Sequence, residues 1–317
     1  MTGAGVSDRS MLGKVTVTGR DRAAFLQGML SNDVKALQPG EGCPAAFLDA
    51  HGKVIALLVA YALEDRILLE LPAGSTEKFL HGIDKFLISE KAYFEAADEE
   101  YAILSIQGPD AEKILSGSSG ATLDLAPYAH AEVSIAGAPV RVMRRSDAAT
   151  PGFHCWTAPP HAGTLWKALT EAGAVPVGAE ALEVLRIEAG IPSYGRDADE
   201  SVILPETRLD ALVSYTKGCY IGQETVARVK YRGHVNRGLS GLVLEGDRVP
   251  GHGDVILAED KEVGRVTSAV RSIALAKPIA LGYIRREHFE PGAAVSVRMG
   301  ESLVPGRVAE LPFVKAA

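Results

Sequence analysis

The chain has 317 residues, of which 47% are hydrophobic and 23% are charged, and its formal net charge at pH 7 is −7. This length and balance are typical of a globular protein with two or three domains, and the charge argues against nucleic-acid or membrane partners. No apolar run approaches the ~20 residues of a membrane-spanning helix. Met1 to Ser10 lack the basic and apolar regions of a signal peptide. We therefore expect a cytoplasmic protein.

The number and spacing of the cysteines also favour a cytoplasmic protein. Cys43, Cys155 and Cys219 are odd in number and far apart, which favours a reducing environment over a disulfide framework. No CxxC motif or clustered Cys/His spacing indicates a metal held by this chain alone.

The first 180 residues alternate between strand and helix patterns. Gly19-Arg20-Asp21 and Gly108-Pro109-Asp110 each separate a strand pattern from a helix pattern, with apolar pairs at the same offset behind them. This repeat predicts two related α+β subdomains, although a strand, a glycine turn and an aspartate also recur by chance. The expected strands are residues 12–17, 45–49, 54–63, 67–71, 102–106, 132–145 (a hairpin) and 152–157, and further helices are expected near 161–172 and 178–188.

Beyond Arg237 the pattern changes to short β-type runs separated by Gly, Pro and Asp turns. Such runs are typical of a small all-β barrel or sandwich. We expect an α+β protein in which residues 1–236 hold two α+β subdomains, about 1–100 plus 180–236 and about 101–179, and residues 237–317 form a C-terminal β-barrel. The β runs are 239–244, 254–258, 263–270, 279–284 and 294–298.

The run from Lys217 to Glu224 combines a thiol, a cation and two glycines. Lys217 lies two residues before Cys219, and a short helix is expected to follow from Gln223. Both features favour a thiolate, so the pattern predicts a lowered pKa and a reactive thiol. The alternative is a packed cysteine in a tight turn.

A local excess of cations follows this run. Five cations stand against Glu224, in a chain whose net charge is negative. The patch could attract an anionic ligand tail, or it could be a solvated helix face. Its cations are Lys217, Arg228, Lys230, Arg232 and Arg237.

Residues 217–224 resemble the K-G-C-Y-x-G-Q-E signature of YgfZ-type folate-binding proteins, which belong to the aminomethyltransferase (glycine-cleavage T-protein) superfamily and serve iron–sulfur enzymes. Further similarity runs from Gly19 through residues 186–192 to residues 280–283. The resemblance implies a three-subdomain fold in which residues 1–236 form the folate-binding region. It also implies a bound tetrahydrofolate or a derivative, and iron–sulfur cluster assembly proteins or client enzymes as partners.

The resemblance further implies the site. Cys219 and Lys217 would be catalytic, and Glu188, in the motif that contacts the pteridine in T-proteins, would accept hydrogen bonds from a pterin. From the residues alone, Glu188 could instead form a salt bridge with Arg186 or Arg196 at a helix end. The implied cofactor-binding residues are Glu188, Arg186, Tyr194, Gln223 and Arg228, and the signature loop comprises Lys217, Gly218, Cys219, Tyr220, Gly222, Gln223 and Glu224.

One departure from the family pattern concerns catalysis. T-proteins carry a G-G-x-x-D-D segment whose second Asp is the acid/base, and residues 52–57 here place Ala56 and Leu57 at the two Asp positions. Leu57 cannot transfer a proton, and Asp49 lies on the other side of the turn. Aminomethyl transfer by the T-protein mechanism is therefore not expected, and the resemblance implies a folate-binding accessory protein for iron–sulfur cluster assembly or repair. The alternatives are a folate-dependent aminomethyltransferase or other one-carbon transferase or demethylase, and a scaffold that binds no folate.

Overall fold

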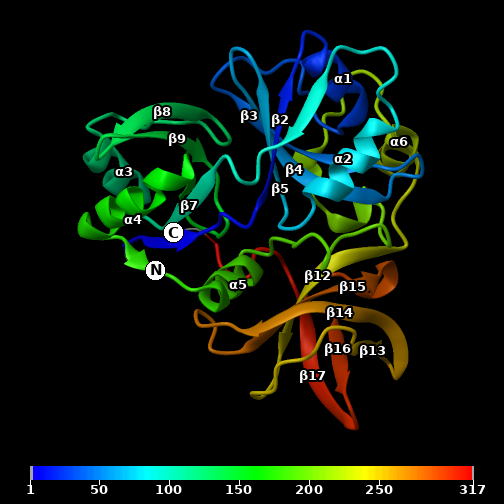
Figure 1. The fold of residues 1–317 in the computed structure, drawn as a ribbon. Coiled ribbons are helices and arrows are strands. Elements are labelled where there is room, and N and C mark those ends of the chain that lie inside the picture. Colours follow the sequence, from blue (N-terminus) through cyan, green and yellow to red (C-terminus); the bar gives the residue numbers. More distant parts are fainter. Residues whose placement is uncertain (1–2, 316–317) are drawn as a thin grey trace. The chain divides into compact units, whose positions relative to one another are not determined.

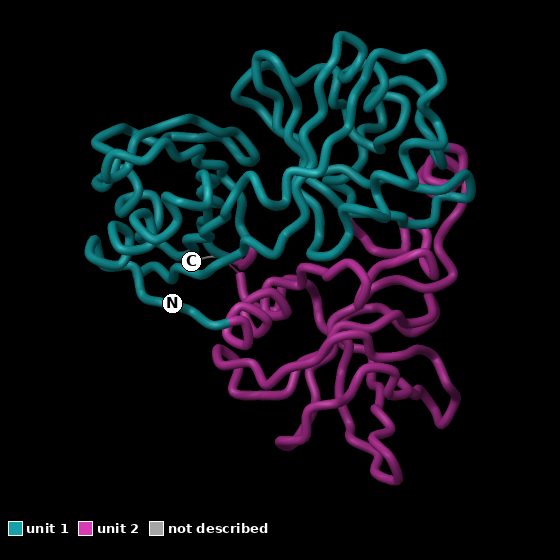
Figure 2. The backbone as a smooth tube through the Cα atoms, viewed as in Figure 1, with its two compact units in different colours: residues 1–146, 150–178, 210–223 teal, residues 147–149, 179–209, 224–317 magenta. Residues whose placement is uncertain are grey.

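The computed structural model describes residues 3–315. The chain divides into two compact units (Figure 2). Unit 1 comprises residues 1–146, 150–178 and 210–223, and unit 2 comprises residues 147–149, 179–209 and 224–317. Across the described range, no helix has both the length and the apolar character needed to cross a bilayer.

The first sheet of unit 1 has five strands in the order β3-β4-β5-β2-β6. Figure 1 labels four of them, β2 to β5, together with α1 and α2. Helices α1 (Arg22–Met29) and α2 (Thr76–Asp84) cover one face, where Phe25, Leu26 and Phe79 are buried in a common core with the strands. The sequence did not predict β6, because its side chains are mostly exposed and carry little periodic signal. The strands are β2 (Gly13–Thr18), β3 (Gly42–Leu48), β4 (Val54–Ala62), β5 (Ile67–Leu71) and β6 (Tyr93–Ala96).

The second sheet of unit 1 has six strands in the order β11-β1-β7-β10-β9-β8. Helices α3 (Ala111–Ser119) and α4 (Ala162–Glu171) cover one of its faces, and Leu115, Leu165 and Leu169 are fully buried there. The strands are β1 (Gly5–Asp8), β7 (Ala102–Gln107), β8 (His130–Ile135), β9 (Ala138–Arg144), β10 (Gly152–Thr157) and β11 (Val175–Pro176).

Strands of the two sheets share a buried cluster on the faces that the helices leave uncovered. Tyr61 of β4 and Trp156 of β10 pack in it. A carboxylate is buried beside them: Glu70 Oε2 accepts hydrogen bonds from His154 Nδ1 at 2.8 Å and from Trp156 Nε1 at 3.2 Å, and Arg145 forms an ion pair with Oε1 at 2.5 Å. A buried charge with these partners is compensated, so the two sheets are joined by a specific polar contact as well as by apolar packing.

The predicted repeat is present in the structure. In both β2–α1 and β7–α3 a glycine of positive φ follows the strand, Gly19 at +93° and Gly108 at +135°. A side chain at either glycine would collide with a backbone carbonyl, that of Lys91 or that of Gly3. Each turn therefore requires glycine for space and for conformation. The aspartates that follow, Asp21 and Asp110, stand at the N-cap positions of α1 and α3, but their side chains make no capping hydrogen bond.

Unit 2 contains a closed barrel in the strand order β12-β15-β14-β13-β16-β17. Helices α5 (Ala179–Glu188) and α6 (Gln223–Arg232) belong to this unit from Ala179 and from Glu224 onward. The sequence missed β17, whose central Pro305-Gly306 reads as a turn. The subdomain limits expected from the sequence remain a prediction. The strands are β12 (Arg237–Leu244), β13 (Val255–Ala258), β14 (Lys261–Arg271), β15 (Pro278–Arg285), β16 (Ala294–Met299) and β17 (Ser302–Ala309).

Candidate functional site

The segment that carries the signature loop is fixed to the connection between α1 and β3. Ser31 Oγ donates a hydrogen bond to the carbonyl oxygen of Leu212 at 2.6 Å, and the N–H of Ser214 donates to the carbonyl oxygen of Ser31. Further along, the N–H of Ile221 donates to the carbonyl oxygen of Gly28. These contacts hold residues 210–223 within unit 1 and set the position of the loop.

Lys217 is 9% exposed and binds the end of α1. Its Nζ donates to the carbonyl oxygens of Gln27 at 2.6 Å, Leu30 at 2.5 Å and Asn32 at 2.9 Å. A cation at this end satisfies carbonyl groups that lack helical partners and complements the helix dipole. Burial lowers the pKa of Lys217 to about 8, although the negative charge of Asp33 opposes this shift.

The structure therefore changes the interpretation of Lys217 and of the three thiols. Cys219 is exposed and has no hydrogen bond within residues 3–315, whereas Cys43 is half-buried and Cys155 is buried. Burial raises the pKa of both Cys43 and Cys155 to about 12, and the Lys217 ammonium opposes the shift at Cys43. The cation that the sequence assigned to Cys219 thus acts on Cys43.

The signature loop rests on the turn between β3 and β4, a contact that the sequence did not reveal. Gly222 has a φ of +81°, and a Cβ there would lie 2.5 Å from the carbonyl oxygen of Asp49. Asp49 Oδ1 accepts hydrogen bonds from the N–H groups of His51 and Lys53, so this carboxylate stabilises the turn. Only glycine allows the loop to approach the turn so closely.

The strand after this turn carries no carboxylate at the two T-protein Asp positions. Ala56 is 1% exposed and belongs to the core of the first sheet, and Leu57 is half-buried. The Asp49 carboxylate is engaged in the turn itself. Neither side chain at 56 or 57 can exchange a proton with a ligand.

Glu188, at the end of α5, is buried within unit 2. Its Oε1 accepts hydrogen bonds from Ser272 Oγ at 2.6 Å and from the N–H of Ala274 at 3.0 Å. Among the described residues Oε2 accepts none. The alternative interpretation, a salt bridge with Arg186 or Arg196, is wrong, because both arginines pair with Glu183 instead.

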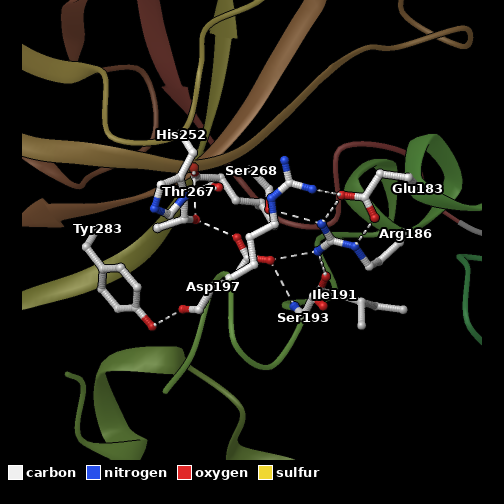
Figure 3. Close-up of polar contacts among 11 residues, drawn as sticks. Glu183, Arg186, Ile191, Ser193, Asp197, His252, Thr267, Ser268 and Tyr283 are labelled. Carbon is white, nitrogen blue, oxygen red and sulfur yellow. Dashed lines mark hydrogen bonds and ion pairs between the residues drawn. The ribbon is translucent and has the colours of Figure 1, made fainter. Parts of the chain in front are cut away.

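Arg186 is the centre of the network in Figure 3. Its five N–H groups donate to Glu183 (twice), Asp197, Ser268 and the carbonyl oxygen of Ile191. No N–H group of Arg186 is left for a ligand in this structure, which argues against the predicted cofactor contact. The network instead joins α5 and the following loop to β14.

The other predicted site residues lie apart along the chain. Tyr194 is half-buried in a loop and forms an isolated β-bridge with Ala198, and Gln223 begins α6. Arg228 is exposed on α6 and has no hydrogen bond or ion pair in the part of the chain that the structure describes. These three ligand contacts remain predictions.

The predicted five-cation patch is not one solvated surface. Lys217 is buried against α1, and Arg237 forms an ion pair with Glu206 at 3.2 Å. Its exposed members lie on α6. Within residues 3–315, no group of three or more His, Cys, Asp or Glu side chains is placed to hold a metal ion.

Family models match most of the chain. The GCVT N-terminal domain model matches residues 1–217, and the glycine cleavage T-protein C-terminal barrel domain model matches residues 237–315. An aminomethyltransferase of Streptomyces avermitilis is 32% identical over 322 residues, which cover 98% of this chain and 87% of the relative. A putative chloroplastic transferase of Arabidopsis thaliana, At1g60990, is 30% identical over 98% of this chain and 72% of its own length.

A solved structure shows the same fold. The glycine cleavage system aminomethyltransferase T from Bartonella henselae superposes with a TM-score of 0.89, covering 99% of this chain and 87% of that chain at 22% identity. The predicted T-protein fold with a C-terminal barrel is thus confirmed.

Proposed function

Because the chain belongs to the glycine cleavage T-protein family, we propose that it binds tetrahydrofolate or a derivative and supports the assembly or repair of iron–sulfur clusters. A folate-derivative cofactor fits the family. Within the family, the signature loop at residues 217–224 supports the YgfZ-type assignment over the glycine-cleavage one.

The observation that carries this choice is the absence of a carboxylate at two positions of β4. Ala56 is buried in the core and Leu57 is half-buried, where T-proteins place an Asp pair. Aminomethyl transfer by the T-protein mechanism needs a group there that can hold and release a proton. An apolar pair keeps the strand intact and leaves that step without its acid/base.

Glu188 supports the folate part of the proposal. Ser272 and the N–H of Ala274 orient the carboxylate through Oε1, and among the described residues Oε2 has no donor. A pterin presents N–H and amino donors side by side, which a carboxylate oxygen can accept. Glu188 would then hold the ring, and its partners would fix the rotamer.

Cys219 supports the iron–sulfur part. It is the one exposed thiol of the three, on a loop that Lys217 and Gly222 fix to unit 1. An exposed thiol on a rigid loop can act as a nucleophile or as a transient ligand to a cluster or to the sulfur of a partner. Its partners would be cluster assembly proteins or client enzymes.

A second candidate is a folate-dependent aminomethyltransferase or another one-carbon transferase. The names of the matched relatives favour it, since those from Streptomyces avermitilis and Halothermothrix orenii are both aminomethyltransferases. It would require a proton-transferring group other than residues 56 and 57.

Calorimetry with 5-formyltetrahydrofolate tests the folate part. We expect a micromolar Kd, roughly −8 kcal/mol. Glu188→Gln should weaken binding by about 1–3 kcal/mol, because an amide NH₂ group can then stand where the pterin needs an acceptor. Glu180→Gln, on the same helix but exposed, is the matched control. Equal affinities in the two variants would remove Glu188 from the site.

Two assays separate the candidates. With lipoyl carrier and tetrahydrofolate, we expect no aminomethyl transfer, and turnover near that of a T-protein would favour the second candidate. Cys219→Ser should fold and bind folate normally but fail to restore iron–sulfur enzyme activity in a strain lacking the protein. If Cys219→Ser fully restores iron–sulfur enzyme activity, the thiol is not needed and the loop has only a structural role.

A further inference from the structure

A cavity of about 590 Å³ opens at one end of the barrel in unit 2. Its walls come from the first residues of β12 and β14, from the end of β15, and from the 3₁₀ segments Leu204–Thr207 and Arg286–His288. The volume is in the range of small-molecule sites. None of the residues assigned above to folate or to the thiol lines it.

Two arginines face each other across the sheet at this cavity. Arg237 of β12 is directly opposite Arg285 of β15 in the antiparallel ladder, so their side chains leave the same face of the sheet. Like charges in this position destabilise a strand pair unless they are compensated. Arg237 is compensated: Glu206 accepts from its Nε at 3.2 Å, and the carbonyl oxygen of Ser201 accepts from Nη2 at 2.8 Å.

Arg285 has no such partner. Within residues 3–315 its side chain makes no hydrogen bond or ion pair, and the same holds for the side chain of Lys261 at the start of β14. Glu262 is paired with Arg265 outside the cavity wall, at 2.8 Å. Glu287 is the one lining carboxylate without a partner among the described residues, so two uncompensated cations face one uncompensated carboxylate.

We propose that this cavity binds a small molecule through a phosphate or carboxylate group held by Arg285 and Lys261. The guanidinium of Arg285 can donate two parallel N–H groups to such an anion, and Lys261 adds a second charge. Glu287 accepts a hydrogen bond from a hydroxyl or ammonium group of the same ligand. The side chain of Arg237 lies over the ring of Tyr283 at 5.2 Å and is fixed by Glu206, so one wall is already ordered.

Calorimetric titration of the full chain with inorganic phosphate and, separately, with succinate tests the proposal, with chloride keeping the ionic strength constant. We expect saturable one-site binding of at least one probe, with a Kd on the order of 1 mM. Phosphate binding alone would indicate a phosphorylated ligand, and succinate binding alone a carboxylate ligand. Both results support the site, whereas no saturation with either probe would overturn it.

Variants locate the binding. Arg285→Gln and Lys261→Gln should each weaken the bound probe about 10-fold or more, because each removes a charge-assisted contact. Arg298→Gln is the matched control, since Arg298 is exposed on β16, lies outside the cavity wall and has no side-chain partner within the described range. Circular dichroism checks folding, and Lys261→Gln carries the test by itself if Arg285→Gln does not fold. An equal loss in Arg298→Gln would show nonspecific charge attraction and overturn the proposal.

Discussion

The ammonium of Lys217 lies 2.5 Å from the carbonyl oxygen of Leu30, the C-cap residue that follows α1. Lys217 is two residues from Cys219 in the chain, but its ammonium group donates hydrogen bonds at the end of α1, a helix that lies about 190 residues earlier. The two neighbouring residues therefore have separate roles: Lys217 fixes the loop to α1, and the loop exposes the thiol of Cys219 to solvent.

Replacing Lys217 tests this structural role. Lys217→Met keeps most of the side-chain length but leaves three carbonyl groups without their donor, so we expect the free energy of unfolding to fall by about 2–4 kcal/mol. Urea denaturation measures the change. Lys35→Met, at an exposed residue close to α1 in the chain, should change stability by less than about 0.5 kcal/mol. A similar small change for Lys217→Met would mean that the carbonyls do not depend on the ammonium.

Alkylation should separate the three thiols by exposure. In native protein, iodoacetamide should modify Cys219 first, because Cys155 is buried and Cys43 is half-buried with a pKa raised to about 12. Mass spectrometry of the digested protein identifies the modified residue at each time. Full modification of all three is expected only in urea. Faster modification of Cys43 than of Cys219 in the native state would contradict the structure.

The buried thiol of Cys155 should make stability depend on alkaline pH. Burial raises its pKa from 9.0 to about 12, so the unfolded chain loses this proton first. The resulting stability is fully present below pH 9 and declines as pH rises from 9 toward 12, by up to about 1.4 kcal/mol per pH unit. Urea denaturation at pH 8, 9 and 10 should show the advantage of the wild type over Cys155→Ala shrinking above pH 9. A constant difference would contradict the burial of the thiol.

The carboxylate between the two sheets of unit 1 should be critical for stability. Glu70→Ala leaves His154 and Arg145 without the group that binds them, and removing one partner of a buried ionic contact costs about 3–5 kcal/mol. Glu64→Ala, at an exposed position on the preceding turn, serves as the control. Thermal unfolding followed by circular dichroism compares the two variants, and equal midpoints would show that Glu70 is not needed to join the sheets.

Asp197 should play the corresponding role in unit 2. Its side chain is fully buried and accepts from Thr267 Oγ1, from the N–H of Ser193 and from Arg186. Asp197→Ala should lower the free energy of unfolding by about 3–5 kcal/mol, because Arg186 loses the fully buried one of its two carboxylate partners, and Thr267 and Ser193 lose their acceptor. Asp247→Ala removes a surface ion pair with Arg271 and should cost at most about 1 kcal/mol. Matching losses in urea denaturation would show that the network in Figure 3 contributes little.

The sequence predicted the order of strands and helices well, because periodicity and turn residues are local properties. The matching positions of Gly19 and Gly108 indicated the internal repeat, and the change of pattern near Arg237 indicated the C-terminal β domain. Strands β1, β6, β11 and β17 were missed. Strand β6 is largely exposed, β17 contains Pro305 and Gly306, and β1 and β11 have only 4 and 2 residues.

The sequence by itself thus determined the succession of elements, the family and the presence of one unusual thiol loop. Only the tertiary structure decided which partner each charged group has: Lys217 binds the end of α1, Glu188 binds Ser272, and Arg237 faces Arg285. The residues next to each of them in the chain do not predict these pairs, because the partners are far apart in sequence and only folding brings them within reach of the side chain. The energy of a buried charge depends on those residues and not on spacing along the sequence.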